Sequence, residues 1–157
     1  MKVKVVCIGK TGKDFLEKGE QEYLNRLKHY LSVERIEIPD VKNQKKRSND
    51  EIKKLEGEQI KKCLSEQEQI YLLDERGKSY SSEAFASFLE NKLLTSTPKI
   101  TFVIGGPYGF TEELKSMAKG KISLSEMTFS HQMVRMIFFE QLYRAMTILK
   151  GEKYHHA

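Results

Sequence analysis

A glycine-rich turn is the first segment whose residue types could take part in chemistry. It reads Gly105-Gly106-Pro107-Tyr108-Gly109, follows the apolar run 100–104 and precedes Thr111, where a helix is predicted to start. Glycines in such a place let the backbone approach a ligand closely and leave N–H groups free to bind it. The spacing differs from G-x-G-x-x-G, so a dinucleotide fingerprint is not supported. These residues alone are explained equally well by a tight turn and by a cofactor loop.

A second segment, residues 124–131 (LSEMTFSH), is unusual for a loop because Leu, Met and Phe recur between small polar residues. One interpretation is an apolar slot for an adenine ring or a methionine tail. The other, which is the more common role of such side chains, is core filling beneath a loop. A third segment, Gly9-Lys10-Thr11-Gly12-Lys13, lacks the spacing of a phosphate-binding P-loop and predicts a plain turn between a strand and a helix.

Two arginines on a predicted apolar helix and three of the four histidines lie in the last part of the chain, after residue 130. The helix predicted over 131–149 is apolar nearly all round, since 12 of the 17 residues from Met133 to Leu149 are apolar. It must bury a second face, which favours a contact with another copy of the chain. We expect Arg135 and Arg144 to point into that interface or an adjoining site. The tail Tyr154-His155-His156-Ala157 is either a frayed end or a catalytic arm.

The elements that position these residues alternate along the chain. Apolar periodicity predicts strands over 2–9, 33–38, 69–74, 100–104 and 121–125, and helices over 13–30, 50–65, from Ser81, from Thr111 and over 131–149. A turn is expected at Glu75-Arg76-Gly77-Lys78. This order predicts an α/β fold, a single domain over 1–157 with a mostly parallel sheet and helices on both faces. Ligands of such sheets bind beyond the carboxyl ends of the strands, next to the segments 73–77, 105–109 and 124–131.

The bulk properties indicate a soluble globular protein. The 157 residues carry a net charge of +5, which suits a polyanion partner, although many basic proteins bind no nucleic acid. The basic residues at 10–13 and 42–47 are candidate phosphate contacts, and the alternative for the cluster at 42–47 is a solvated charged loop. Cys7 and Cys63 are unclustered, so neither a disulfide nor a metal site is expected. Neither a membrane span nor a signal peptide is recognisable, which favours the cytoplasm.

Together these segments resemble the ribosomal RNA large-subunit methyltransferase H family, a small branch of the SPOUT superfamily of knotted methyltransferases. The resemblance covers the whole chain in order. It is carried by residues 2–10, 23–30, 72–77, 81–83, 102–106, 124–129, 131–135, 140–145 and 154–155. One departure is Ser130, where the family usually has proline, which is expected to loosen the loop. The residues after His155 vary in the family, so the role of His156 stays open.

The resemblance implies a deep trefoil knot near the C-terminus and a homodimer whose active site is completed across the interface. It implies S-adenosylmethionine as the methyl donor, no metal, and N3-methylation of a pseudouridine in 23S ribosomal RNA of the assembled ribosome. DNA and membranes are not expected partners. The cofactor contacts carried onto this chain are Leu73, Gly105, Leu124, Ser125, Glu126, Met127, Thr128 and Phe129.

Three residues are candidates for the chemistry of methyl transfer. We expect Arg144 to stabilise the negative charge that develops on the target base. His155 is expected to accept the proton or to orient the group that does, and Tyr154 to pack against the target nucleotide. His131 is expected to hold the cofactor loop in shape. Two alternatives stay open: an enzyme of the same fold acting on transfer RNA, and a non-catalytic ribosome-binding factor that takes up no cofactor.

Overall fold

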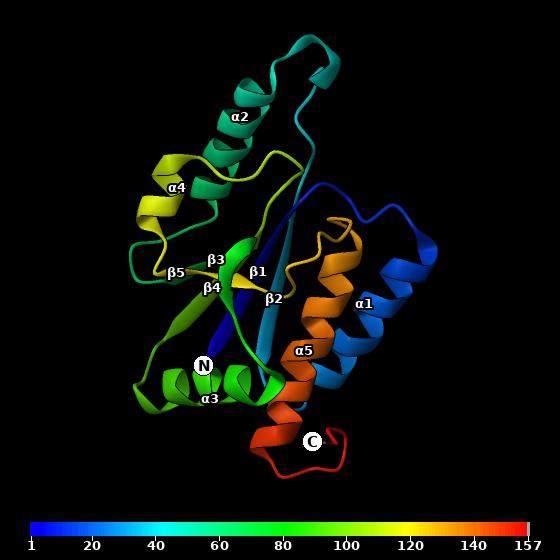
Figure 1. Ribbon diagram of the computed structural model, residues 1–157, viewed down its shortest axis with the longest axis vertical. Coiled ribbons are helices and arrows are strands. Elements are labelled where there is room, and N and C mark those ends of the chain that lie inside the picture. The colour runs from blue at the N-terminus through cyan, green and yellow to red at the C-terminus, as the bar shows by residue number, and fades with distance from the viewer. Residues whose placement is uncertain (157) are drawn as a thin grey trace.

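The computed structural model describes residues 1–156 and shows the predicted alternation of strands and helices (Figure 1). The elements in chain order are β1 (Lys2–Ile8), α1 (Asp14–Leu27), β2 (Ser32–Ile38), a short 3-10 helix η1 (Gln44–Lys46), α2 (Asn49–Lys62), β3 (Gln69–Ser79), α3 (Ser82–Leu94), β4 (Lys99–Ile104), α4 (Glu112–Met117), β5 (Gly120–Ser123) and α5 (Met133–Leu149). None of the described helices is long and apolar enough to cross a membrane.

The strands form one sheet in the order β2-β1-β4-β3-β5, and every neighbouring pair is parallel. The predicted mostly parallel sheet is therefore confirmed. The central strands β1 and β4 are buried on both faces, which explains why they read as nearly continuous apolar runs. Because the strands are parallel, the carboxyl ends of β3, β4 and β5 lie at one edge of the sheet. The trefoil knot stays a prediction of the family resemblance.

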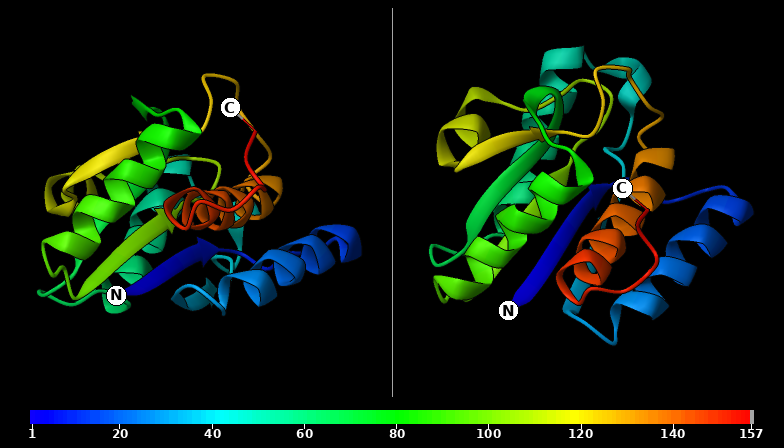
Figure 2. Two further views of the ribbon diagram at one scale, coloured as in Figure 1. Left: turned by 90° about the horizontal axis from the view of Figure 1, so that it is seen from below. Right: turned by 60° about the horizontal axis from the view of Figure 1, so that its bottom comes forward.

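Helices cover both faces of the sheet, as predicted. On one face α1, α3 and α5 enclose a core that includes Phe102 and Phe138 (Figure 2). The opposite core includes Val103 of β4 and is covered by Ile60 of α2 and Leu114 of α4. The chain after α5 turns back beside that helix (Figure 2). There the ring of Tyr154 packs edge-on against Tyr143, with 4.7 Å between the ring centroids.

Three helices begin at polar caps that the sequence pattern indicates. The side-chain oxygens of Ser48, Ser81 and Thr111 each accept a hydrogen bond from the backbone N–H three residues later. Each cap satisfies a donor that the first turn would otherwise leave unpaired, which stabilises a helix by about 1 kcal/mol. These caps fix where α2, α3 and α4 start relative to the sheet edge.

Strand β3 is longer than predicted. The sequence places its end at Asp74 and a turn at 75–78, but the strand runs on to Ser79. Its pairing with β5 jumps from Leu73 to Lys78, both opposite Ile122, so residues 74–77 bulge out of the ladder. A Cβ atom at Gly77 would lie only 2.6 Å from the backbone of Lys121, which explains why this position is glycine. A bulge changes the direction in which nearby side chains point, and this one lies where the carboxyl ends of β3, β4 and β5 meet.

Helix α5 is covered more fully by its own chain than predicted, because it packs against both α1 and α3. The prediction that Arg135 points into an interface or a site is wrong. Its side chain is fully buried and donates to the Thr11 hydroxyl at 2.9 Å and to the backbone carbonyl of Ile8. Arg135 therefore ties the start of α5 to the end of β1, since a buried guanidinium needs hydrogen-bond acceptors.

Candidate active site

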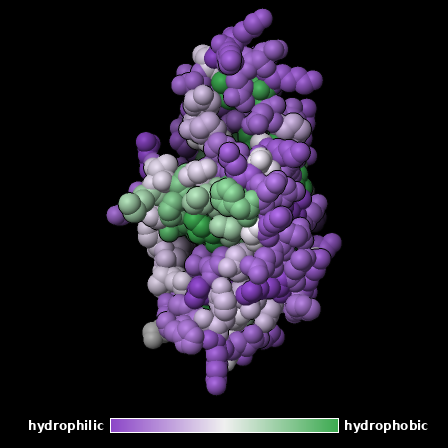
Figure 3. Space-filling model, turned by 90° about the vertical axis from the view of Figure 1, so that its right-hand side faces the viewer, coloured by the Kyte–Doolittle hydropathy of each residue, from purple (hydrophilic) through white to green (hydrophobic). Residues whose placement is uncertain are grey.

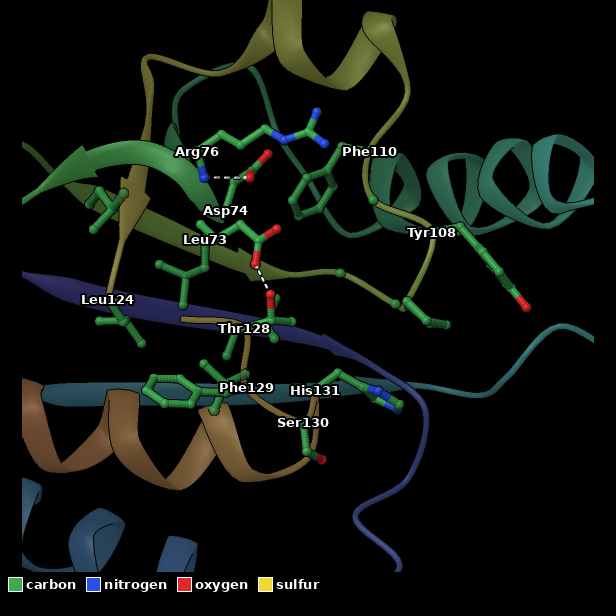
Figure 4. Close-up of a pocket in the computed structure, with 18 of the residues that line it drawn as sticks. Leu73, Asp74, Arg76, Tyr108, Phe110, Leu124, Thr128, Phe129, Ser130 and His131 are labelled. Atoms are coloured by element: carbon green, nitrogen blue, oxygen red, sulfur yellow. Dashed lines mark hydrogen bonds between the residues drawn. The ribbon is translucent and has the colours of Figure 1, made fainter. Parts of the chain in front are cut away.

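A cavity of about 540 Å³ lies at the carboxyl ends of β3, β4 and β5 (Figure 4). Its volume is in the range of small-molecule and cofactor sites, roughly 300–1,000 Å³. Its wall is formed by the three segments that the sequence singles out: the β3 bulge, the glycine turn after β4 and the loop after β5. Lys53 of α2 and Lys115 of α4 add positive charge to the wall. The fold thus gathers segments that are far apart in the sequence around one cavity.

Seven of the eight residues expected to hold the cofactor line this cavity: Leu73, Gly105, Leu124, Ser125, Met127, Thr128 and Phe129. Glu126 is exposed and is not among the lining residues. Figure 4 shows Leu73, Leu124 and Phe129 together on one side of the cavity, with Tyr108 on the other. His131 also lines the wall. The binding of a cofactor by these residues stays a prediction.

The glycine turn is packed so closely that its first two positions leave no room for a side chain. A Cβ atom at Gly105 would lie 2.8 Å from the ring of Phe110, and one at Gly106 would lie 2.5 Å from Oε2 of Glu56. Gly109 has a φ of 81°, a left-handed conformation that glycine adopts without strain. At Gly105 and Gly106 the turn therefore presents backbone to the cavity, whereas Pro107 and Tyr108 add side chains to its wall.

The loop over 124–131 is held by hydrogen bonds along most of its length, and its first residue, Leu124, packs against the core. The Ser125 hydroxyl accepts from the backbone N–H of Met127 at 2.9 Å, and the Thr128 hydroxyl bonds to the carboxylate of Glu75 on the β3 bulge. Met127 is 76% exposed and Phe129 is 36% exposed, so core filling does not explain these two side chains. Their exposure at a cavity wall fits the alternative interpretation, an apolar slot for a ligand.

Ser130 contributes contacts that a proline at this position could not make in full. Its hydroxyl accepts a hydrogen bond from the backbone N–H of Gln132 at 3.3 Å, and its carbonyl accepts from Val134 at 3.0 Å. The side chain of Gln132 in turn accepts from the backbone N–H of Gly12 at 2.9 Å. These contacts join the end of the cavity loop to the start of α5.

The three residues expected to do chemistry form a second cluster, on α5 and the tail. Both Nε and Nη2 of Arg144 bond to Oε1 of Glu140, at 3.0 and 2.6 Å. The Tyr154 hydroxyl donates to the same oxygen at 3.0 Å, and the Arg144 guanidinium lies 4.7 Å from the centre of the Tyr154 ring. His155 Nδ1 lies 3.1 Å from Nη1 of Arg144, and its Nε2 lies 2.9 Å from Glu83. Ala157, the last residue of the expected arm, lies outside the described residues.

The electrostatics of this cluster favour a fixed cation. The hydrogen bond to Glu140 raises the pKa of Arg144, so the guanidinium stays charged. Burial, with added contributions from Tyr23 and Glu140, raises the pKa of the Tyr154 phenol well above its ordinary value. The bond from His155 lowers the pKa of the Glu83 carboxyl. Since Arg144 is always a donor, the His155 Nδ1 accepts and the ring proton sits on Nε2, facing Glu83.

Sequence reasoning did not assign site roles to two residues of this cluster. Glu140 is four residues before Arg144, and a pair of opposite charges at that spacing on a helix is a detectable pattern. Glu83 is 72 residues from His155, and nothing in the local sequence indicates their contact. Within residues 1–156, no group of three or more His, Cys, Asp or Glu side chains is placed to hold a metal ion.

The cavity and the C-terminal cluster do not meet within one protomer. Val134 lines the cavity, whereas Arg144, Tyr154 and His155 do not. Ten residues of α5 separate Val134 from Arg144, which is about 15 Å along the helix axis. The cavity and the C-terminal cluster are therefore separate features of the chain.

Comparisons with known proteins identify the family of this chain. Residues 1–155 match a family model described as "Predicted SPOUT methyltransferase". The chain is 50% identical over 156 residues to a protein of Parabacteroides distasonis, covering 99% of both chains. It is 51% identical to a protein of Christiangramia forsetii and 48% identical to one of Porphyromonas gingivalis, with the same coverage. All three are named ribosomal RNA large subunit methyltransferase H. The chain therefore belongs to the SPOUT methyltransferases and, within them, to the ribosomal RNA large-subunit methyltransferase H family.

Proposed function

We propose that this chain is a cytoplasmic, homodimeric enzyme that methylates N3 of a pseudouridine in 23S ribosomal RNA of the assembled ribosome, with S-adenosylmethionine as the methyl donor. One observation carries the proposal. In a chain that matches its named relatives over 99% of its length, the three segments expected to bind the cofactor line one cavity. The family supports the reaction class, and the cavity supports the assignment of the cofactor site to these three segments.

The residues around the cavity fit such a cofactor. The apolar side formed by Leu73, Leu124 and Phe129 suits the face of an adenine ring. The bare backbone of the glycine turn offers N–H and C=O groups to the polar edges of a nucleoside or an amino-acid tail. When bound, S-adenosylmethionine supplies a methyl group that its sulfonium makes electrophilic. Holding the target nitrogen in line with that group can lower the barrier by roughly 7–11 kcal/mol.

The C-terminal cluster supplies the charges that the target base needs. N3 of a pseudouridine carries a proton at neutral pH, and its loss leaves negative charge on the two flanking carbonyl oxygens. The guanidinium of Arg144 stabilises that charge. His155 accepts the proton or orients the group that does, and Tyr154 packs against the nucleotide. Because Glu140 and Glu83 occupy Arg144 and His155 in this structure, the substrate must displace or share these contacts.

A homodimer would bring the cluster to the cavity. Phe15 of α1 is 65% exposed and Met133 of α5 is 39% exposed, and Val134 and Ile137 are half-buried beside them. Figure 3 looks onto this side of the molecule and shows an apolar patch surrounded by hydrophilic surface. If two copies pack α5 antiparallel about Ile137, Arg144 lies opposite the cavity loop of the partner, because seven residues separate Ile137 from each.

Basic side chains beyond the cavity suit the ribosomal RNA backbone. Lys42, Lys45, Lys46 and Arg47 are exposed on and around η1. None of the four forms a salt bridge with another residue in the range 1–156. Unpaired cations on a protruding segment are free to neutralise phosphates. The same applies to Lys10 and Lys13 in the turn before α1.

The proposal is tested by methyl transfer from labelled S-adenosylmethionine to three substrates: assembled ribosomes that lack the modification, protein-free 23S RNA and bulk transfer RNA. We expect label in 23S RNA of the assembled ribosomes, at N3 of one pseudouridine. Label in transfer RNA alone would favour the alternative substrate. Titration calorimetry with S-adenosylmethionine separates both from a non-catalytic factor, which would show no binding.

A further inference from the structure

Glu56 is a buried acidic residue directly behind the cavity wall. It lies on α2 and is 3% exposed. A Cβ atom at Gly106 would lie 2.5 Å from its Oε2, and Gly106 lines the cavity. Its other carboxyl oxygen, Oε1, has no hydrogen-bond partner among residues 1–156. Only the glycine turn therefore separates an unpaired carboxyl from the space in which the ligand binds.

No cation offsets this carboxyl in the described part of the chain. Within residues 1–156 Glu56 takes part in no salt bridge, and the charged group that acts on it is the carboxylate of Asp40, which lies against Gly9 after β2. Lys53, one turn earlier on α2, lines the cavity and has its ammonium 3.8 Å from Asp50. The glycine turn itself brings no charge. Burial and the like charge of Asp40 together raise the pKa of Glu56 to about 7.

A buried carboxyl without a partner ionises most readily when a positive charge arrives beside it. The methyl donor carries a sulfonium cation, whereas its demethylated product is a neutral thioether of nearly the same shape. Apolar contacts and backbone hydrogen bonds do not distinguish these two molecules, because they are made to the adenosine and amino-acid parts that both molecules share. A charged group near the sulfur position distinguishes them, because only the donor carries a positive charge there.

We propose that Glu56 is a specificity-determining residue of the cofactor cavity, whose carboxylate favours the cationic methyl donor over the neutral demethylated product. This inference rests on the proposed function. As the sulfonium enters, the proton of Glu56 leaves to solvent and the carboxylate remains behind the glycine turn. After methyl transfer the cavity holds no cation, the carboxyl takes a proton back, and the product loses its electrostatic attraction. Glu56 thus assists exchange of product for fresh donor.

The expected effect is measurable. Two unit charges roughly 10 Å apart at an effective dielectric constant of about 20 change a binding constant on the order of tenfold. Above pH 7 Glu56 is already ionised, so the attraction between its carboxylate and the sulfonium strengthens donor binding in full. Near pH 6 the carboxyl must first lose its proton, and the free energy of that ionisation reduces the gain in donor affinity. The preference for donor over product should therefore increase about fivefold between pH 6 and pH 8 in the wild-type chain, because part of the effect is already present at pH 6.

The experiment is titration calorimetry on the full chain with S-adenosylmethionine and with S-adenosylhomocysteine at pH 6, 7 and 8. The variants are Glu56→Gln and, as a matched control, Glu58→Gln, which changes an exposed glutamate of the same helix. Comparing proteins with the same ligand cancels the ionisation of the ligand itself. We expect Glu56→Gln to lower the donor-to-product preference at pH 8 about tenfold and to flatten its pH dependence, while Glu58→Gln behaves as wild type.

Proton release gives a second readout. In two buffers of different ionisation enthalpy near pH 6.5, donor binding should release a proton from the wild-type chain and none from Glu56→Gln. Asp40→Asn, which removes the like charge, should move the pH midpoint of the preference to lower pH. Unchanged preference and proton release in Glu56→Gln would overturn this inference while leaving the proposed function intact. Binding of neither ligand by the wild-type chain would overturn the proposed function, and this inference with it.

Discussion

Nη1 of Arg144 lies 3.1 Å from Nδ1 of His155, and this contact decides which nitrogen of the histidine can act. The guanidinium can only donate, so it occupies the lone pair on Nδ1. The opposite nitrogen faces Glu83 at 2.9 Å. As long as both contacts persist, His155 has no free lone pair with which to accept a proton. If His155 is the base, as proposed, the substrate must first take Arg144 for itself, and substrate binding is then coupled to activation of the base.

Replacing Arg144 with alanine should abolish methyl transfer and leave cofactor binding nearly intact. Arg144 does not line the cavity of its own protomer, and its proposed role is to stabilise charge that develops only in the reaction. Loss of one such donor lowers kcat by about 10²–10³-fold. Single-turnover methyl transfer measures the loss, and calorimetry measures the affinity for S-adenosylmethionine. Arg144→Lys is the control that keeps the charge and loses the paired geometry. A large loss of cofactor affinity in Arg144→Ala would contradict the assignment.

Deleting residues 154–157 should give a folded dimer without activity. Residues 154–156, the described part of this tail, lie beside α5, where the Tyr154 ring meets Tyr143, and contribute no side chain to the two buried cores. Light scattering and thermal unfolding check that the dimer and its stability persist, with activity measured on ribosomes. The point variants Tyr154→Phe and His155→Asn separate the two roles. Full activity of the truncated chain would exclude the tail from catalysis.

Glu56→Gln should be more stable than the wild-type chain at high pH. The pKa of Glu56 is about 7 in the folded chain and about 4.5 when exposed, so the folded state holds a proton that the unfolded state loses. The stabilisation is present below pH 4.5 and is lost as pH rises through 7. A shift of this size corresponds to about 3 kcal/mol. Urea unfolding at one protein concentration gives the free energy of unfolding of both proteins at pH 5 and pH 8. The free energy of Glu56→Gln relative to wild type should be larger at pH 8 than at pH 5. The same difference at both pH values would show that the pKa of Glu56 is not raised.

Placing a methyl group at Gly106 should damage the cavity wall more than the fold. The added Cβ of Gly106→Ala would lie 2.5 Å from the carboxyl of Glu56, so the glycine turn or the buried side chain must shift. We expect S-adenosylmethionine affinity to drop at least tenfold, with a loss of stability of about 1–3 kcal/mol. Gly12→Ala is the matched control, because its added Cβ meets nothing closer than 3.9 Å. Calorimetry on both variants checks this. Wild-type affinity in Gly106→Ala would show that the turn does not shape the site.

The predictions from the sequence agree with the structure for features that depend on residues close together in the chain. Apolar periodicity and the caps at Ser48, Ser81 and Thr111 were enough to predict the alternating strands and helices. The β3 bulge was not predictable, because its position depends on the register with β5, which the local pattern does not contain. The orientation of Arg135 was misjudged for a related reason, since its acceptors Thr11 and Ile8 are over 120 residues away.

The candidate site likewise contains segments that the sequence predicts and contacts that it does not. The glycine turn and the loop 124–131 carry their own local patterns and could be recognised from sequence. The contact between His155 and Glu83 and the approach of Glu56 to Gly106 arise only when the sheet is assembled. Contacts between residues so far apart in the sequence depend on the order and pairing of the strands, which a single sequence does not directly reveal.

Removing the positive charge of Lys45 and Lys46 should weaken ribosome binding through its electrostatic part. Both side chains are exposed on η1, and neither forms a salt bridge within the described range 1–156. Each phosphate contact that is lost should reduce the slope of log K against log salt by about 0.7–0.9. Ribosome binding of Lys45→Ala/Lys46→Ala, measured at several salt concentrations, should show a slope about 1–2 smaller. Lys2→Ala, an exposed lysine at the opposite end of the sheet, is the control. Methyl transfer should fall through KM and not kcat, because neither lysine lines the cavity. An unchanged slope would show that the η1 segment faces solvent and that another surface binds the RNA.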